Sequence, residues 1–446
     1  MKLSKKKLIF GFAILPTILI LAFSLKLQSN SKSAVTAEVL QIALSNNLPN
    51  KLVMTKSIEF FENRLNERNG EDILAQNQLL RNYLARFKAY GRQEDLAAAK
   101  KHLSSLLKRY PKKASLYSTL ANVQMAGHQF ENAVESAEKA IEVAEAEDFV
   151  KLHLRLFDAL LTYGDYDEAG DILRTMSFNR RSVDFLVREA RLEDKLGNLA
   201  KAKSGMQKAL YQAKAYAQSP VVIGWCRVTL GHYEHHSGNP QKAVDIYLEA
   251  LKQLPGYPAA LEGIAAISHK IDHNLIAAKQ LYQKALGNGG ELDIYSNLIA
   301  IEQQLGNDEN AETYRNHFIK EATRDPQIER LFYRPLALLF AEKKEMLSRA
   351  LHYARLDLKN RPSSESYDTL AWVLYKRGDI ENAYEAATKA VAWGRPEPTV
   401  LYHSGIIMWD FGEKQKAQVL LEAALQNALE LDANIVAEIR FKLQMS

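Results

Sequence analysis

The chain has almost no cysteine and none of the short motifs that mark the common enzyme classes. Its 446 residues include one cysteine, Cys226, so no disulfide can form within the chain and no CxxC metal or redox motif is present. A GxxxxGK[ST] phosphate loop and a GxSxG nucleophile turn are both absent. We therefore expect a protein that is not an enzyme, with no cofactor and no small-molecule substrate.

The chain also lacks an excess of positive charge outside its N-terminus. Its formal net charge is +5, from 58 basic and 53 acidic residues. Residues 1–33 contain six lysines and no acidic residue, so the basic and acidic residues of the remaining chain nearly balance. A balanced body offers no surplus cations to neutralise phosphates, and we therefore expect no nucleic-acid partner.

Long uncharged runs are absent except for one near the N-terminus. Residues 8–25 (LIFGFAILPTILILAFSL) would form a helix of about 27 Å, close to the thickness of the hydrocarbon core. Four lysines precede this run, and such charge favours the cytoplasmic side. The sequence predicts a cytoplasmic basic tail at 1–7, a transmembrane anchor at 8–25 and a polar tether at 26–37. The protein is then single-pass in the membrane, with its body extracytoplasmic, either periplasmic or at the cell surface.

A cleaved signal peptide is the alternative interpretation of the same run. The apolar part of a signal peptide covers about 7–15 residues and ends near a pair of small residues. The run here is longer, and the KLQSNSK that follows it has no such pair. These features favour the anchor, and the protein is secreted if the segment is cleaved.

One pattern recurs through the rest of the chain: a glycine, a polar residue and, five positions after the glycine, an alanine. Its copies begin at Gly164, Gly197, Gly238, Gly306, Gly378 and Gly412. From Gly378 to Gly412 the step is 34 residues, and the segment 259–291 carries His273 in place of the glycine. Glycine ends a helix because it adopts the left-handed conformation at little cost, and alanine lets two helices approach closely.

This pattern resembles the tetratricopeptide repeat, a helix-turn-helix unit of about 34 residues. In the segment 364–397, the family's pattern is matched by Tyr367, Leu370, Ala371, Leu374, Gly378, Ala383, Ala387 and Ala390. The resemblance implies an all-α, right-handed α-solenoid of about ten units over 80–431, behind the membrane helix, as in membrane-anchored bacterial members of the family. Residues 38–79 are expected to form an irregular helical first unit, and 432–446 a C-terminal capping helix.

The stretch GHYEHHSG (231–238) places three histidines in the first helix of one predicted unit. One face of that helix carries Trp225, Val228, His232, His235 and His236. In the tetratricopeptide family this face lines the concave groove, and the same positions near the C-terminus are Phe332, Trp372, Tyr375, Tyr402 and Trp409. Toward the N-terminus they are charged and mixed: Arg81, Lys88, Lys151, Asp158, Arg191, Asp194 and Lys195. Interfaces favour Trp and Tyr, so we expect the aromatic positions to bind a partner.

Three functions remain open at this point. The favoured one is a scaffold or adaptor that binds a peptide segment or a helix of a partner protein in the groove. By resemblance to bacterial proteins of this kind, its role lies in envelope assembly or quality control. The second is a metal-dependent hydrolase centred on His232, His235 and His236, although the HExxH zinc motif needs glutamate where Tyr233 stands. The third is a structural module that assembles with its own copies.

Overall fold

The described part of the chain folds mainly into helices, and no strand occurs in it. The computed structural model describes residues 33–45, 51–68, 70–90, 93–145, 148–393, 396–426 and 428–444. Its α-helices are α2 (Ala37–Ser45), α3 (Lys51–Glu67), α4 (Ile73–Tyr90), α5 (Gln93–Arg109), α6 (Ala114–Ala126), α7 (Phe130–Glu142), α8 (Phe149–Tyr163), α9 (Tyr166–Thr175), α10 (Val183–Lys195), α11 (Leu199–Ala215), α12 (Pro220–His236), α13 (Pro240–Gln253), α14 (Pro258–Lys270), α15 (Leu275–Gly287), α16 (Ile294–Gln304), α17 (Asp308–Ala322), α18 (Pro326–Glu329), α19 (Tyr333–Ala341), α20 (Leu347–Asn360), α21 (Ser364–Lys376), α22 (Ile380–Ala392), α23 (Pro398–Phe411), α24 (Lys414–Gln426) and α25 (Ala433–Gln444). Short 3-10 helices lie between some of them: η2 (Ser177–Asn179), η3 (Arg330–Phe332), η4 (Lys344–Met346) and η5 (Ala428–Glu430).

Helices that follow one another pack in pairs, and each pair packs on the next. Among the described residues the pairs are α4–α5, α6–α7, α8–α9, α10–α11, α12–α13, α14–α15, α16–α17, α19–α20, α21–α22 and α23–α24. A short turn joins the two helices of a pair, so they run antiparallel. This arrangement confirms the prediction of an all-α solenoid of helix-turn-helix units.

The turns within several pairs share one sequence, Glu-x-x-x-Gly-Asn, at 193–198, 234–239 and 302–307. The glycine of each has a positive φ, of 86°, 77° and 74° respectively. In each turn the asparagine amide donates a hydrogen bond to the glutamate carboxylate, at 2.7, 3.0 and 2.9 Å. His273 takes the glycine's place in the α14–α15 turn with a φ of 51°. A side chain in this conformation costs about 1–2 kcal/mol, so packing around that turn must offset the strain.

The recurring alanine of the pattern lies where the two helices of a pair cross. Its copies are at most 2% exposed: Ala169, Ala202, Ala243, Ala311, Ala383 and Ala417. At each crossing a larger side chain would push the helices apart, at a cost of about 1–3 kcal/mol. The sequence pattern therefore marks the contacts that hold each pair together.

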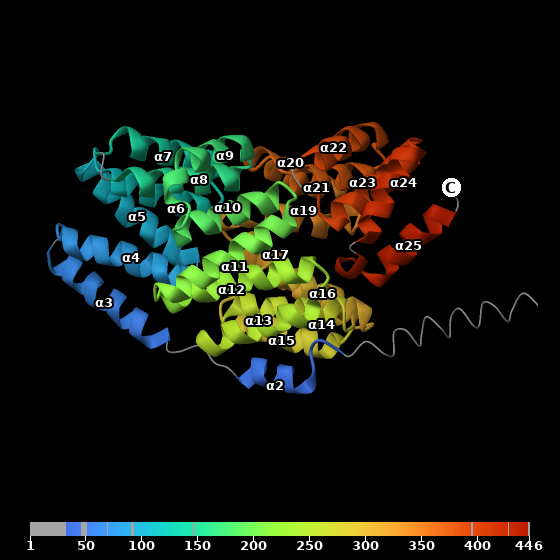
Figure 1. Cartoon of the computed structure of the whole chain (residues 1–446), viewed down its shortest axis with the longest axis horizontal. Helices are drawn as coiled ribbons and strands as arrows, with labels where there is room; N and C mark the ends of the chain where they lie inside the picture. The colour runs from blue at the N-terminus through green and yellow to red at the C-terminus, as the bar shows by residue number, and fades with distance from the viewer. Residues whose placement is uncertain are drawn as a thin grey trace, which may run out of the picture.

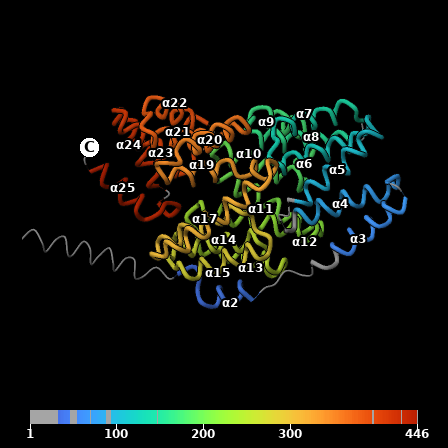
Figure 2. Tube along the Cα trace, turned by 180° about the vertical axis from the view of Figure 1, so that it is seen from behind, coloured from blue at the N-terminus to red at the C-terminus, as the bar shows by residue number. Residues whose placement is uncertain are grey.

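The solenoid curves until helices near α9 touch helices near α20, while α4 and α25 lie on opposite sides of the molecule (Figures 1 and 2). We call 73–215 the N-terminal arm, 220–322 the middle pairs and 333–444 the C-terminal arm. Both views place α9 of the N-terminal arm beside α20 of the C-terminal arm (Figures 1 and 2). At this contact Lys195 Nζ lies 3.6 Å from Glu365 Oε1, and a Cβ on Gly164 would lie only 2.6 Å from the carbonyl oxygen of Pro362. The inner face is therefore enclosed by both arms instead of being an open groove.

Residues 38–79, expected as one irregular unit, are divided in the structure. Helix α2 contacts α13 and α15 of the middle pairs, whereas α3 contacts α4. At the other end of the chain α25 packs on α24, and its Ile439 is fully buried. The last pair is therefore covered by a further helix.

No helix among the described residues is long and apolar enough to cross a membrane. The predicted basic tail at 1–7 and transmembrane anchor at 8–25, with most of the tether at 26–37, lie outside the described residues. The described helices bury one apolar face against their neighbours and expose a charged one. The prediction of a single-pass membrane protein with extracytoplasmic repeats is therefore corrected, because the described part of the chain contains no helix that could span the membrane.

Candidate functional site

A cavity of about 430 Å³ lies on the inner face where the two arms meet, and we call it the central cavity. One wall comes from the first helices of three consecutive pairs and the turn after α8. The opposite wall comes from the start of α21 and the residues before it. The lining is Leu161, Thr162, Gly164, Tyr166, Arg191, Asp194, Lys195, Trp225, Thr229, His232, Tyr233, His236, Arg361, Ser363 and Glu365. A site of this form combines aromatic surface with charged groups of both signs.

Three of the predicted groove residues line this cavity: Trp225, His232 and His236. The other two on the same helix do not. Val228 is 4% exposed and belongs to the core of the middle pairs. His235 is partly buried, and its Nε2 has no hydrogen-bond partner among the described residues. The predicted face of α12 is therefore divided between the cavity and the packing against its neighbours.

The three histidines differ in their partners and in the direction of their pKa shifts. His232 Nδ1 lies 3.0 Å from the Tyr247 hydroxyl, and burial lowers the pKa of His232 to about 4. Burial, helped by the neighbouring His236, also lowers the pKa of His235 to about 4. Burial alone would lower the pKa of His236, but Glu430, whose Oε1 lies 2.9 Å from its Nδ1, outweighs this and raises that pKa. At neutral pH the first two are therefore uncharged, while His236 pairs with the C-terminal arm.

The structure does not bring these rings together as a metal site. Among the described residues no group of three or more His, Cys, Asp or Glu side chains is placed to hold a metal ion. His232 and His236 use Nδ1 for separate partners, Tyr247 and Glu430, which lie on different elements. No observation therefore favours the hydrolase alternative.

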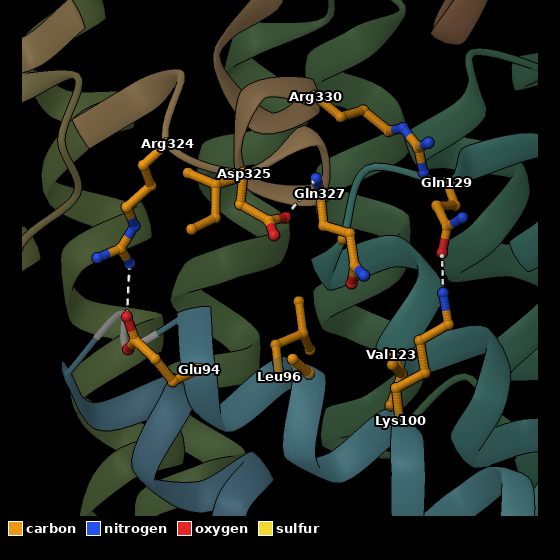
Figure 3. Close-up of a pocket in the computed structure, with 12 residues that line it drawn as sticks. Glu94, Leu96, Lys100, Val123, Gln129, Arg324, Asp325, Gln327 and Arg330 are labelled. Atoms are coloured by element: carbon orange, nitrogen blue, oxygen red, sulfur yellow. Dashed lines mark hydrogen bonds and ion pairs between the residues drawn. The ribbon is translucent and has the colours of Figure 1, made fainter. Parts of the chain in front are cut away.

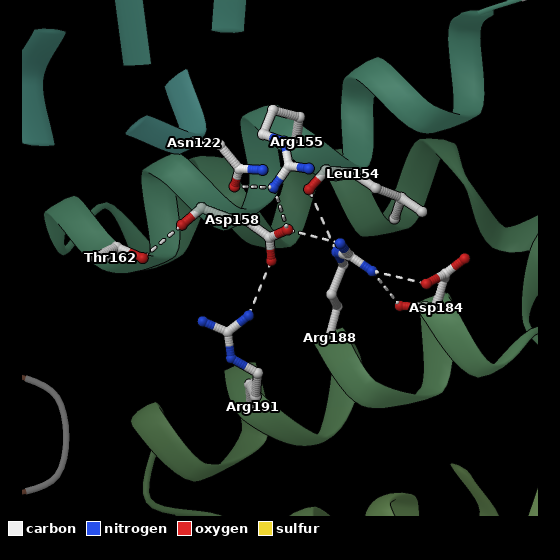
Figure 4. A network of polar contacts seen from close by, with 8 residues as sticks. All are labelled: Asn122, Leu154, Arg155, Asp158, Thr162, Asp184, Arg188 and Arg191. Atoms are coloured by element: carbon white, nitrogen blue, oxygen red, sulfur yellow. Dashed lines mark hydrogen bonds and ion pairs between the residues drawn. The ribbon is translucent and has the colours of Figure 1, made fainter. Parts of the chain in front are cut away.

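An arginine network extends the wall of the cavity along α6, α8 and α10. The carboxylate of Asp158 on α8 accepts hydrogen bonds from two arginines of α10, Arg188 Nη2 at 2.6 Å and Arg191 Nη1 at 2.8 Å (Figure 4). Arg155 lies 3.7 Å from the same carboxylate and donates to the Asn122 amide oxygen at 2.7 Å. Arg188 also lies 3.5 Å from Asp184, so three guanidinium groups face two carboxylates, and the one positive charge in excess can accept a further acidic group. We call Asn122, Arg155, Asp158, Arg188 and Arg191 the arginine network.

The closing wall is held by ion pairs that the C-terminal arm makes with the N-terminal arm and with the middle pairs. Burial alone would raise the pKa of Glu365, but Lys195 and Arg334 outweigh it and lower that pKa to about 2. Lys270 of the middle pairs lies 3.4 Å from Asp432 and donates to the Glu430 carbonyl oxygen at 3.3 Å. These contacts come from elements far apart in the sequence, and repeat analysis alone gives no signal for them.

The predicted aromatic positions of the C-terminal arm do come together, but they pack on one another. The Trp372 ring lies 4.0 Å from His403, 5.3 Å from Tyr375 and 6.1 Å from Tyr402, measured between centroids. Lys414 and Lys442 lie near the Trp409 ring, at 5.6 and 5.8 Å from its centroid. We call Trp372, Tyr375, Tyr402, His403 and Trp409 the aromatic cluster.

Helix α25 covers the aromatic cluster, and one predicted position lies elsewhere. The Tyr402 hydroxyl donates to Glu438 of α25 at 2.7 Å, and Lys442 of α25 reaches Asp410 at 2.8 Å. Phe332 is 5% exposed, and its ring packs edge-on against Phe318 in the core. The C-terminal positions are therefore internal contacts rather than an open binding surface.

A second cavity, of about 360 Å³, separates α5 and α6 from the segment between α17 and η3. Figure 3 shows Arg324 reaching across it to Glu94, and the two side chains lie 2.6 Å apart. Leu96, Val123 and Ile328 give it an apolar floor. None of the predicted residues lines it, and it forms part of the contact that closes the solenoid.

Comparisons with known proteins return other helical repeat proteins. No family model matches the chain, and no curated protein matches it. Similar solved structures include a tetratricopeptide repeat protein from Parabacteroides merdae (18% identity, 59% of this chain and 99% of that chain, TM-score 0.35). They also include yeast Tom70 (13% identity, 83% and 96%, TM-score 0.35) and the human IFIT1 dimer with PPP-AAAA (17% identity, 75% and 77%, TM-score 0.46).

Identities and TM-scores at this level carry no argument about this chain, so its class rests on its own architecture. Paired helices, steps of 34 residues and left-handed turn residues make it a tetratricopeptide-like helical repeat protein. The membrane-anchored bacterial character expected from the sequence is not shown by these similarities.

Proposed function

We propose that the chain is a non-catalytic scaffold that binds a peptide segment of a partner protein in the central cavity. The observation that carries this proposal is the cavity itself, whose walls are built by three consecutive first helices and closed by the C-terminal arm. Its volume falls within the range of roughly 300–1,000 Å³ that is typical of ligand pockets. Aromatic surface beside placed charges is the composition expected of a site that binds one segment selectively.

The chemistry of the walls indicates which segment fits. The three guanidinium groups of the arginine network face the carboxylates of Asp158 and Asp184, so one positive charge remains in excess and favours an acidic group. Trp225 and Tyr166 offer aromatic surface within the adjoining cavity. The preferred ligand is therefore a segment in which a carboxylate lies close to an apolar or aromatic side chain.

The closing wall affects how such a segment enters. Glu365 and Lys195 lie on opposite sides of the cavity and form an ion pair there. An incoming carboxylate competes with Glu365 for Lys195, and so binding loosens one contact between the arms. We therefore expect affinity for acidic segments to fall as salt rises, since exposed ion pairs are screened over about 8–10 Å at physiological ionic strength.

A random peptide library screened with the full chain tests this proposal. We expect enrichment of peptides that place a carboxylate beside an apolar side chain, and a loss of about 30-fold in their affinity in Trp225→Ala. Trp409→Ala is the matched control, because Trp409 is half-buried in the aromatic cluster and away from the cavity. Absence of enriched peptides, or equal binding by both variants, would contradict the proposal.

The other predictions about partners keep their status as predictions. The near balance of charge outside residues 1–33 still argues against a nucleic-acid partner. A role in envelope assembly or quality control rests on the sequence resemblance alone. Salt-dependent binding of single-stranded RNA by the full chain, tested beside the peptides, would overturn the first of these.

A further inference from the structure

Helix α2 lies on the outer side of the solenoid, against helices far from it in the sequence. It contacts α13 and α15, the second helices of two middle pairs, and both views place it beside them (Figures 1 and 2). Helix α3, which follows α2 in the chain, packs instead on α4. Residues 33–45 therefore have a docking surface of their own. It consists of Asp272 and of the apolar side chains of α13 and α15 that face α2, and we call it the α2 groove.

The polar part of the α2 groove is a single carboxylate. Asp272, in the turn between α14 and α15, accepts the backbone N–H of Ala34 at 2.9 Å and that of Val35 at 2.7 Å. Hydrogen bonds to a charged acceptor are about twice as strong as neutral ones. Because the donors are consecutive backbone amides, the carboxylate fixes the direction in which the segment enters the groove.

The apolar part is a stripe that begins at Val35, just before α2, and continues along the helix. Val35, Val39 and Ala43 recur every four residues, and they are buried together with Ala34 in the core of the middle pairs. The opposite side of the helix is exposed, for example at Gln41. A helix of nine residues is marginal in water by itself, so α2 depends on the groove for its structure.

We propose that the α2 groove also binds residues 33–45 of a second copy of this chain, so that two copies exchange their N-terminal segments. An identical copy carries both the apolar stripe and the paired amides, whereas another protein would have to reproduce both. In the sequence only residues 46–50 separate α2 from α3, so release of the segment disturbs no helix pair. Exchange of an identical element is a low-cost route to a dimer.

Docking within one chain competes with this exchange. A short linker holds the segment at an effective concentration in the millimolar range, so the contact within the chain dominates in dilute solution. Exchange should therefore be detectable in a mixture of two variants. One variant has a damaged α2 groove and an intact segment 33–45, and the other has an intact α2 groove and a damaged segment. A dimer formed in this way presents two central cavities on one particle.

Two full-length variants supply these complementary parts. Asp272→Lys removes the acceptor and leaves α2 intact, whereas the double variant Val39→Asp/Ala43→Asp charges the buried stripe and leaves the groove intact. Sedimentation velocity should show monomers for each variant alone and a heterodimer in their mixture. The matched control replaces the double variant by Gln41→Asp, which charges the exposed side of α2. That chain keeps its own segment docked, so its mixture with Asp272→Lys should stay monomeric.

Each outcome decides the proposal. A monomeric mixture overturns it, provided that the helical circular dichroism of each variant falls short of the parent's by no more than the nine residues of α2. Dimers of the double variant alone also overturn it, because they do not use the segment. Binding of a labelled peptide 33–45 to the double variant without any heterodimer would assign the groove to a helix of another protein instead. If Asp272→Lys loses helical content, Asp272→Ser takes its place with the same expectations.

Discussion

Two parts of the inner face hold equivalent repeat positions and use them differently. On α12, Trp225 and His232 face the central cavity. On α21 and α23, Trp372 and Tyr402 pack against each other, and Glu438 of α25 bonds to the Tyr402 hydroxyl. The difference comes from what lies opposite: a cavity in the first case and a covering helix in the second. The position of a residue within its repeat therefore indicates an inner-facing side chain, but its neighbours decide whether that side chain can meet a partner.

Breaking the cover over the aromatic cluster should have the largest effect. Ile439→Asp places a charge at a fully buried position of α25 and should cost on the order of 4 kcal/mol, enough to undock that helix. The aromatic cluster then becomes accessible, and quenching of tryptophan fluorescence by acrylamide should rise. The exposed Ala437→Asp is the control and should leave quenching unchanged. Equal quenching in both variants would show that α25 does not cover the cluster.

Replacing one tryptophan in each region should separate stability from binding. Trp372→Ala should lower the free energy of unfolding by about 3 kcal/mol, because its ring stacks on His403 and Tyr375. Trp225→Ala should cost about 1 kcal/mol in urea unfolding but about 2 kcal/mol in affinity for the selected peptides. The reverse pattern, with Trp372→Ala losing peptide affinity and keeping stability, would move the site to the C-terminal arm.

The closure that creates the cavity depends on a missing side chain. Gly164→Ala should cost about 2–3 kcal/mol, since its φ of 108° strains any side chain and the Cβ would meet the Pro362 carbonyl. Gly238→Ala, at a φ of 77° with no atom within 4 Å, should cost only about 1 kcal/mol. Small-angle scattering should show a larger radius of gyration for the first variant alone. Equal radii for both variants would mean that the contact does not hold the arms together.

Acidification should destabilise the region around α12 through two partly buried histidines. The pKa values of His232 and His235 are lowered to about 4, so their contribution to stability is complete above pH 6.5 and is lost as the pH falls toward 4. His236 acts in the opposite direction: its pKa is raised, and its contribution is lost as the pH rises through that value. Between pH 7 and pH 5, urea unfolding of the parent should lose roughly 1–2 kcal/mol more per histidine than His232→Gln/His235→Gln. An identical pH dependence in both proteins would contradict the burial of these rings.

The repeat architecture was predictable because each unit carries its own signal. Turn glycines such as Gly238 and crossing alanines such as Ala243 act within one pair, so their spacing alone indicates the fold. Even the departure at His273 marks a turn, since that residue adopts the conformation of the glycine it replaces. Such features need no knowledge of residues elsewhere in the chain.

The site was predictable only in part, because its second wall depends on long-range closure. The helical face of α12 identifies Trp225, His232 and His236, but nothing in the repeat pattern brings Glu365 opposite them. Closure results from small rotations summed over many pairs, and a local pattern does not contain that sum. The docking of α2 was missed for the same reason: Ala34 and Asp272 are 238 positions apart.

Closure of the solenoid also changes how it should come apart. An open repeat array behaves as a chain of nearest-neighbour units and frays from its ends. Here the ion pair of Lys195 and Glu365 joins the two arms. Helix α21 therefore has a neighbour from the N-terminal arm in addition to the neighbours within its own arm. Amide hydrogen exchange in α21 should therefore be as slow as in α10, and pulling on the two ends should meet one cooperative rupture before any stepwise unravelling of single pairs.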